Sequence, residues 1–141
     1  MNIDTHSDSE IRDFYKLKNI AVVGVSKNET KPSNFVPKYL IEKGYNILPI
    51  NPTISEVFGK KAFPNFSSIE GKIDILNIFR KSEDIPEIIK DLQMQLKGLK
   101  LIWMQVGIYN KDAERWAKEN DIEMVYNRCM MEEHKRLFGR Q

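Results

Sequence analysis

The loop after the first apolar segment of the chain carries residue types that suit a phosphate. Residues 20–25 are continuously apolar, and the residues after them are polar as far as Ser33. A buried strand followed by a turn and a helix leaves backbone N–H groups free at the helix N-terminus, where the helix dipole favours an anion. Lys27 and Lys31 add positive charge to this loop, and Ser26 and Thr30 add hydroxyl donors. The segment therefore predicts a site for a phosphorylated ligand.

The same loop argues against two common nucleotide sites. A dinucleotide fingerprint needs G-x-G-x-x-G, but the loop has only Gly24, and Ser26 stands where the second glycine belongs. An NAD site also needs an acidic residue after the second strand, where this chain has Asn51 and Pro52. No Gly-Lys-Ser/Thr ends a Walker A loop. The phosphorylated ligand is therefore not expected to be NAD or a nucleoside triphosphate in a P-loop.

Residues that could act as catalysts are sparse. His6 falls in a segment expected to be loose, and His134 falls on a helix expected at the surface; neither has a nucleophile near it in the sequence. Cys129 is the single cysteine, and no histidine stands at zinc-finger spacing from it. We therefore expect no catalytic residues and no metal site, and binding rather than catalysis is the favoured activity.

Composition limits the class of protein further. The chain has 141 residues, of which 41% are hydrophobic and 30% charged, with a net charge of +2. These values are typical of a globular domain, and the basic residues form no run of the kind that binds nucleic acid. No apolar stretch approaches the ~20 residues of a membrane span. With one cysteine and no signal sequence, we expect a cytoplasmic protein that binds neither nucleic acid nor membrane.

The apolar pattern predicts alternating strands and helices. Strands are expected over residues 20–25, 45–50, 73–79, 99–104 and 123–126, and helices over 9–17, 33–44, 82–96, 110–120 and 130–137. Connections of this length exclude hairpins and favour βαβ crossovers. We therefore predict an α/β fold, a Rossmann-like, open, doubly wound parallel sheet of about five strands, in one domain over residues 1–141. Residues 1–7 are expected to be flexible, and Pro49 is expected to mark an edge strand or a bulge.

Ligands of doubly wound sheets bind outside the carboxyl ends of the strands, near the point where the strand order reverses. Besides the first loop, the segments at these ends are Asn51–Pro52, Phe79–Arg80 and Gln105–Gly107, with Cys129 after the last strand. An aromatic residue and a cation such as Phe79 and Arg80 can stack on a base or pair with a phosphate. The acidic residues of the helix over 82–96 are expected on its solvated face. These are Glu83, Asp84, Glu87 and Asp91.

Taken in order, these segments resemble a known family. The segments of this chain that carry the resemblance are 20–26, 31–33, 49–52, 73–75 with 79–80, 103–107, and 127–130 with 133–134. The chain is similar to the small, single-domain CoA-binding proteins, which are related to the nucleotide-binding domain of the succinyl-CoA synthetase α subunit. It departs from them at Val25, where alanine is frequent, and at Lys31, where arginine is common. Lysine keeps the positive charge but lacks the bidentate fork of arginine.

The resemblance implies that coenzyme A or an acyl-CoA lies across the carboxyl ends of the strands, with its diphosphate at the first loop and its adenine near the second and third loops. The chain is then a CoA-binding protein without clear catalytic machinery, and a protein partner remains open. Two alternatives are an NAD(P)- or nucleotide-dependent enzyme using the same crevice, and a partner-binding module with a vestigial site. The residues expected to contact CoA are Gly24, Val25, Ser26, Lys27, Lys31, Pro32, Ser33, Asn51, Pro52, Phe79, Arg80, Gln105, Gly107 and Cys129.

Overall fold

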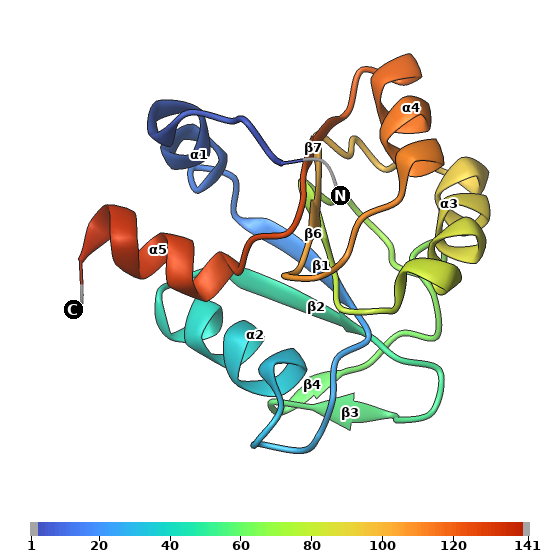
Figure 1. Ribbon diagram of the computed structural model, residues 1–141. Helices are drawn as coiled ribbons and strands as arrows, with labels where there is room; N and C mark the ends of the chain where they lie inside the picture. Colours follow the sequence, from blue (N-terminus) through green and yellow to red (C-terminus); the bar gives the residue numbers. More distant parts are fainter. Residues whose placement is uncertain (1–2, 140–141) are drawn as a thin grey trace.

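A five-stranded parallel sheet forms the centre of the molecule. The computed structural model describes residues 3–139, and its main sheet has the strand order β2-β1-β5-β6-β7 (Figure 1). The bounds are β1 Asn19–Val23, β2 Asn46–Ile50, β5 Ile75–Ile78, β6 Leu101–Met104 and β7 Glu123–Val125. The predicted fold class is therefore confirmed, and each strand lies within or beside its predicted range.

The three central strands are largely apolar because both of their faces are covered; within them, Asn77 of β5 is a buried polar residue. Every residue of β5 and β6 is buried, as are four of the five residues of β1. Two cores result, one on each face of the sheet, with Ala21 and Val23 on one face and Ile20 and Val22 on the other. Alternate residues point to opposite faces of a strand, so a continuous apolar run serves both cores.

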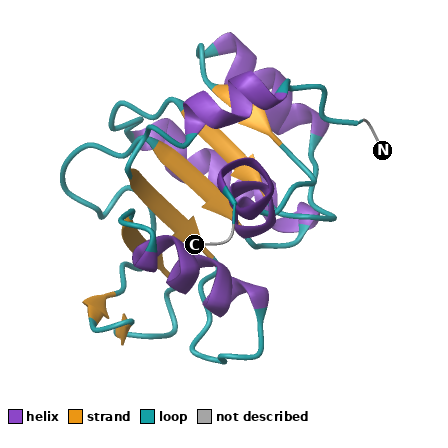
Figure 2. Cartoon of the chain, turned by 90° about the vertical axis from the view of Figure 1, so that its left-hand side faces the viewer, coloured by secondary structure: helices purple, strands orange, loops and turns teal. Residues whose placement is uncertain are grey.

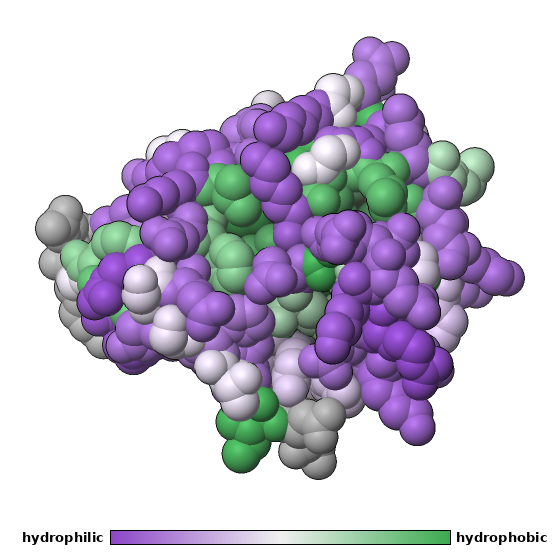
Figure 3. Space-filling view, turned by 90° about the horizontal axis from the view of Figure 1, so that it is seen from above, coloured by the Kyte–Doolittle hydropathy of each residue, from purple (hydrophilic) through white to green (hydrophobic). Residues whose placement is uncertain are grey.

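Helices cover both faces of the sheet (Figure 2). They are α1 Asp8–Phe14, α2 Pro32–Glu42, α3 Ile85–Met94, α4 Lys111–Glu119 and α5 Met130–Phe138. The first two and α5 supply apolar side chains to the core that contains Ile20, and α3 and α4 supply the core that contains Ala21. Within residues 3–139, no helix combines the length and the hydrophobicity that a membrane span needs. Hydrophilic side chains cover most of the face seen in Figure 3.

The ends of the helices differ slightly from the sequence predictions. Helix α1 is capped by Ser7 rather than Ser9: the Ser7 hydroxyl accepts a hydrogen bond from the Glu10 backbone N–H, and the Glu10 carboxylate accepts one from the Ser7 N–H. This reciprocal capping box fixes the start of the helix. Helix α2 begins at Pro32 rather than at Ser33 or Asn34, since proline suits the first helical position.

Strand β2 forms one edge of the sheet, as Pro49 predicts. The Pro49 carbonyl accepts a hydrogen bond from the Phe63 backbone N–H, so the segment that follows β2 partly covers this edge. Between Pro49 and Phe63 the chain forms a small antiparallel hairpin of β3 Glu56–Val57 and β4 Lys60–Lys61. The sequence analysis did not predict this hairpin. Two-residue strands are too short to leave an alternating pattern.

Within the segment before α1, Asp4 contacts the loop after β7; residues 1–2 lie outside the described residues. The Asp4 side chain is 3% exposed and accepts hydrogen bonds from the Arg128 guanidinium (3.0 Å) and the Tyr126 backbone N–H (3.1 Å). Burial alone raises the pKa of Asp4, but hydrogen bonds and positive charge from His6 outweigh it and lower this pKa. A buried carboxylate with these partners ties the N-terminus to the end of β7.

Replacing Asp4 tests this attachment. Asp4→Asn is expected to lower the free energy of unfolding by about 2 kcal/mol at neutral pH, because a charged, buried hydrogen-bond acceptor is lost. The folded-state pKa of Asp4 lies below its ordinary value of 3.8, so its contribution is present above that pH and is lost as the pH falls further. Denaturant unfolding at pH 7 and pH 3 measures both effects. The exposed Glu119→Gln serves as control, and equal stability of the two variants at pH 7 would contradict the attachment.

Candidate functional site

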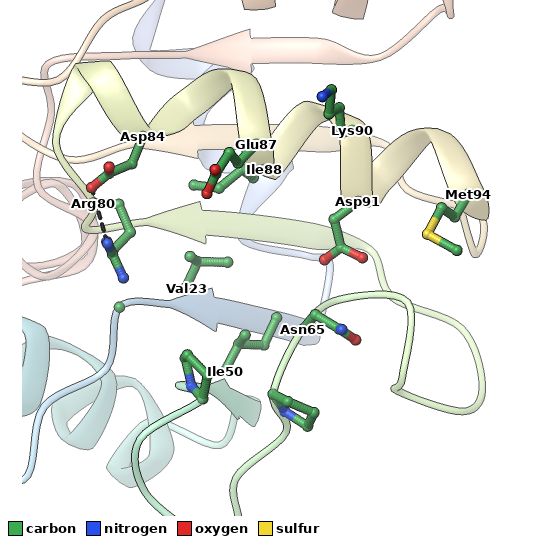
Figure 4. A pocket seen from close by; sticks show the side chains of 13 residues that line it. Val23, Ile50, Asn65, Arg80, Asp84, Glu87, Ile88, Lys90, Asp91 and Met94 are labelled. Atoms are coloured by element: carbon green, nitrogen blue, oxygen red, sulfur yellow. Dashed lines mark hydrogen bonds and ion pairs between the residues drawn. The ribbon is translucent and has the colours of Figure 1, made fainter.

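A cavity of about 310 Å³ lies at the carboxyl ends of β1, β2 and β5 (Figure 4). The strand order reverses here, because β1 is followed by α2 on one face of the sheet and β5 is followed by α3 on the other. Such a reversal opens a crevice between the two loops that leave the strands. The cavity is lined by Val23, Gly24, Ile50, Pro52, Pro64, Asn65, Arg80, Asp84, Glu87, Ile88, Lys90, Asp91 and Met94.

Gly24 lets the loop after β1 pass close to the end of β5. Its φ is +89°, and a Cβ atom built there would lie 3.0 Å from Cδ and 3.3 Å from Cγ of Arg80. Its N–H donates to the Ile50 carbonyl at 3.1 Å, which joins the ends of β1 and β2. Glycine is therefore required both by the left-handed backbone and by the Arg80 side chain that packs on it.

Arg80 supplies positive charge to the cavity and is held by Asp84. The Arg80 Nε and Nη2 atoms donate to Asp84 Oδ2 at 3.2 and 3.0 Å. The Arg80 side chain remains 47% exposed, so its guanidinium is accessible to a ligand. Arg80 also lies four residues before Asp84, at the start of the turn that leads into α3, and this spacing positions the pair.

The acidic residues of α3 are partly misassigned by the sequence analysis. Asp84, Glu87 and Asp91 line the cavity instead of lying on a purely solvated face. The Asp91 carboxylate accepts hydrogen bonds from the backbone N–H groups of Phe66 (2.6 Å) and Ser67 (3.2 Å), so it anchors the loop that carries Asn65. Helical spacing identifies the face of α3 but not the distant loop that covers it, so no sequence signal pointed to Pro64 or Asn65.

Internal hydrogen bonds shape the loop between β1 and α2. The Ser26 N–H donates to the Ser33 carbonyl (3.2 Å), and the buried Asn34 amide donates to the Ser26 carbonyl (2.7 Å). The first turn of α2 has no side-chain cap, and Lys31 occupies the N-cap position. The sequence analysis did not identify Asn34 as a residue that shapes this loop. The signal for it was a polar amide at a position of α2 where the helical spacing expects an apolar side chain.

The other residues predicted for the ligand site near this loop differ in burial and in their contacts. Val25 is fully buried in the core, and its carbonyl already accepts a hydrogen bond from the Asn51 amide at 2.8 Å. The exposed Lys27 pairs with Glu56 of the hairpin at 3.3 Å. Pro32, at the first position of α2, is exposed, and Pro52 lines the cavity. Gly24, Pro52 and Arg80 are therefore the predicted residues that the structure brings together.

Four predicted residues after β5, β6 and β7 also lie outside the cavity lining. Phe79 packs into the core beside α2 and α5, and Gln105 is buried with its Oε1 atom unpaired. The Gly107 N–H donates to Asn127 Oδ1 at 2.7 Å in the loops after β6 and β7. Cys129 is half-buried at the N-cap of α5 and lines a separate hollow with Asn127. These residues share the carboxyl edge of the sheet with Gly24 but do not line its cavity.

With this geometry in hand, comparison with known proteins is informative. Residues 18–135 match the family model of the CoA binding domain. The chain belongs to this family of CoA-binding domains. The expected resemblance is therefore confirmed. Over 129 residues the domain is 35% identical to the uncharacterized protein YneT of Bacillus subtilis (strain 168), covering 91% of this chain and 94% of YneT.

Two further relatives place the CoA-binding domain among small proteins and large ligases. A hypothetical protein from Pyrococcus horikoshii OT3 has a solved structure with 38% identity and a TM-score of 0.91, covering 99% of this chain and 97% of that one. An acetate–CoA ligase (ADP-forming) of Methanocaldococcus jannaschii is 27% identical over 87% of this chain, but the match spans 18% of the ligase. The domain thus corresponds to a small part of that ligase.

The histidines of the CoA-binding domain lie away from its cavity. His134 Nδ1 is 2.7 Å from the Tyr39 hydroxyl, and the ring contacts Tyr15 and Phe138, so this residue is not simply on the surface. Burial first, and then the charges of Lys43 and Lys18, lower the pKa of His134. Within residues 3–139, no three His, Cys, Asp or Glu side chains are grouped as a metal site requires.

Glycine substitutions test the close approach at the cavity. Gly24→Ala and Gly44→Ala both place a Cβ on a backbone with positive φ (+89° and +94°), but only the first meets Arg80; at Gly44 nothing lies within 4 Å. Both variants are expected to lose about 1–2 kcal/mol from backbone strain. Gly24→Ala should lose about 1 kcal/mol more from overpacking. Denaturant unfolding measures the difference, and equal losses would show that Arg80 does not press on Gly24.

Proposed function

We propose that the protein binds coenzyme A or an acyl-CoA across the carboxyl ends of its strands. The observation that carries this proposal is the cavity at the switch point, with Gly24 on one side and Arg80 on the other. The volume of about 310 Å³ is near the lower limit of small-ligand pockets. It suits one end of an extended ligand, with the rest lying over the neighbouring loops.

The adenine end of CoA fits the cavity. The aliphatic side chains of Val23, Ile50 and Ile88 line it, and these offer contact surface to a flat base. The carboxylate of Glu87, on the α3 side, is an acceptor for an exocyclic amine.

The phosphates are proposed to lie between the first loop and Arg80. In the first turn of α2, Pro32 has no N–H and the Asn34 N–H donates to the Lys31 carbonyl, which leaves the Ser33 N–H as the backbone donor for a phosphate, and Lys31 adds positive charge beside it. Arg80 is accessible from the cavity, and a phosphate that binds it must compete with Asp84 for the same guanidinium. We assign contacts to Ser26, Lys27, Pro32 and Ser33 along this path, and to Phe79, Gln105, Gly107 and Cys129 further along the carboxyl edge.

CoA is favoured over NAD by the role of Asn51. Its amide donates to the Val25 carbonyl, and its Oδ1 accepts from the Thr53 N–H (2.8 Å) and hydroxyl (2.7 Å). This side chain shapes the turn after β2 and lacks the carboxylate that binds ribose hydroxyls in NAD sites. We propose a carrier, sensor or subunit of the cytosol rather than a stand-alone enzyme. The similarity to the M. jannaschii acetate–CoA ligase supports CoA as the ligand.

Ligand comparison tests the proposal directly. CoA is expected to bind more tightly than dephospho-CoA, since the 3′-phosphate adds a charge-assisted contact, and both are expected to bind more tightly than NAD. Isothermal titration calorimetry at one salt concentration measures the three affinities. Tighter binding of NAD would support the alternative of an NAD(P)-dependent enzyme, and no binding of any of the three would indicate a vestigial crevice. Either result contradicts the proposal.

Arg80 provides a residue-level test. Arg80→Ala is expected to weaken CoA binding by about 1–3 kcal/mol, because a charge-assisted hydrogen bond to phosphate or a stacking contact is lost. Its stability should change little, because the ion pair with Asp84 is half-exposed. Arg115→Ala removes a similar exposed ion pair, with Asp112 on α4, and should leave CoA binding unchanged. An unaltered dissociation constant with a lowered melting temperature would assign Arg80 a structural role only.

A further inference from the structure

The segment before α1 runs along one edge of the sheet. Strand β7 is an edge strand, and the chain before α1 passes beside it in Figure 1. The Asp4 carboxylate accepts a hydrogen bond from the Tyr126 N–H just after the end of β7, and His6 Nε2 lies 3.4 Å from Glu123 Oε1 at its start. The segment therefore spans the length of β7. We call residues 3–7 the strap.

Polar contacts hold the strap against β7, because its apolar surface is not buried. Ile3 is 82% exposed, and Thr5 is exposed as well. The contacts to β7 and to the loop after it come from Asp4 and His6: the Arg128 guanidinium donates to the Asp4 carboxylate and to the His6 carbonyl, each at 3.0 Å. Segments with little buried apolar surface open more easily than the core does. The attachment of the strap should therefore respond to changes in charge.

The His6 ring lies between two carboxylates. Its Nδ1 is 3.0 Å from Asp4 Oδ1, its Nε2 faces Glu123, and the ring meets the ring of Phe14 at an edge. A protonated imidazole carries a hydrogen on both nitrogens and can donate to both carboxylates, whereas a neutral imidazole carries only one. In the neutral form one carboxylate therefore faces a nitrogen lone pair, and the strap loses one of its contacts.

The charged groups around His6 favour its protonated form. Glu10 of α1 adds a third carboxylate, and the Arg128 guanidinium, which donates to the His6 carbonyl, is shared with Asp4 and Glu133. The hydrogen bond to Asp4 outweighs burial and raises the pKa of His6 above its ordinary value of 6.5. The stabilisation that protonated His6 gives is therefore complete below pH 6.5 and is lost as the pH rises through the raised pKa.

The strap forms one wall of a hollow at the carboxyl edge of the sheet. Ile3 and Asp4 line this hollow of about 430 Å³ together with Val106 and Cys129. Cys129 is half-buried and is the single cysteine of the chain. Movement of the strap away from β7 would remove this wall and give solvent more access to the Cys129 thiol.

We propose that the strap is a pH-dependent cover of this hollow, which closes along β7 when His6 is protonated and opens when His6 is neutral. Arg128 contacts Asp4 whatever the charge of His6, so the pH changes the fraction of molecules with an open strap and leaves the sheet intact. The proposal concerns residues 3–7 and does not depend on CoA binding.

Hydrogen exchange of the Tyr126 amide, followed by NMR, tests the opening, because this N–H donates to Asp4 in the closed strap. Its protection factor is expected to fall about threefold or more between pH 5.5 and pH 8.5, since a partly exposed ionic contact is lost. The Gln105 amide, which donates to the Ile78 carbonyl within the sheet, should keep its protection. His6→Gln should show the lower protection of Tyr126 at both pH values.

Alkylation of Cys129 by iodoacetamide measures access to the hollow. At pH 6, His6→Gln should react about threefold faster than the wild type, and at pH 8.5 the two proteins should react alike. Loss of the positive charge of His6 by itself favours the less reactive thiol over the thiolate. A faster reaction of the variant at pH 6 must therefore come from an open strap.

Three further variants serve as comparisons. Glu123→Gln removes one of the two carboxylates beside His6 and should reduce the pH dependence of Tyr126 protection. The exposed Glu119→Gln on α4 removes the same charge and should behave like the wild type, as should His134→Gln, which removes the other histidine. The proposal is overturned if Tyr126 protection in the wild type does not change with pH or if His6→Gln keeps the wild-type pH dependence. Equal alkylation rates of His6→Gln and the wild type at pH 6 overturn it as well.

Discussion

The close approach of β1 to β5 at Gly24 is the constraint on which the candidate CoA site depends. At this point the backbone turns with a φ of +89°, and the stem of Arg80 packs where a Cβ would lie. The approach is possible because β1 and β5 pair in parallel and send their following helices to opposite faces of the sheet. Closing this gap with a side chain would move Arg80 and change the entrance to the cavity at the same time.

Charge is arranged differently at the two edges of the sheet. At the carboxyl edge, Arg80 and Lys90 share their cavity with Asp84, Glu87 and Asp91, so the acidic side chains outnumber the basic ones. At the amino edge, Arg12, Lys16, Lys18 and Lys43 line a hollow that has one carboxylate, Asp13, among the described residues. A ligand of the carboxyl-edge cavity must therefore gain much of its affinity from contact with apolar walls and backbone groups.

The N-terminal segment adds a third charged arrangement, which is structural. Arg128 donates to Asp4 at 3.0 Å and to Glu133 at 2.7 Å, and both carboxylates have a lowered pKa despite burial. This network joins the start of the chain, the end of β7 and helix α5. Because α5 also carries Cys129 at its N-cap and His134, which contacts Tyr15, the network helps to hold this helix against the sheet.

The sequence by itself determined the α/β class, the five strands, the edge position of β2 and the loops that meet at the carboxyl edge of the sheet. Continuous apolar runs and helical spacing are local signals, and Gly24 and Arg80 follow directly from their places at strand ends. Tertiary structure alone decided that Asp91 anchors the loop of Asn65, and that Lys18 and Lys43 converge near His134. These groups are far apart in the chain, and packing that joins distant segments leaves no periodic pattern in one sequence.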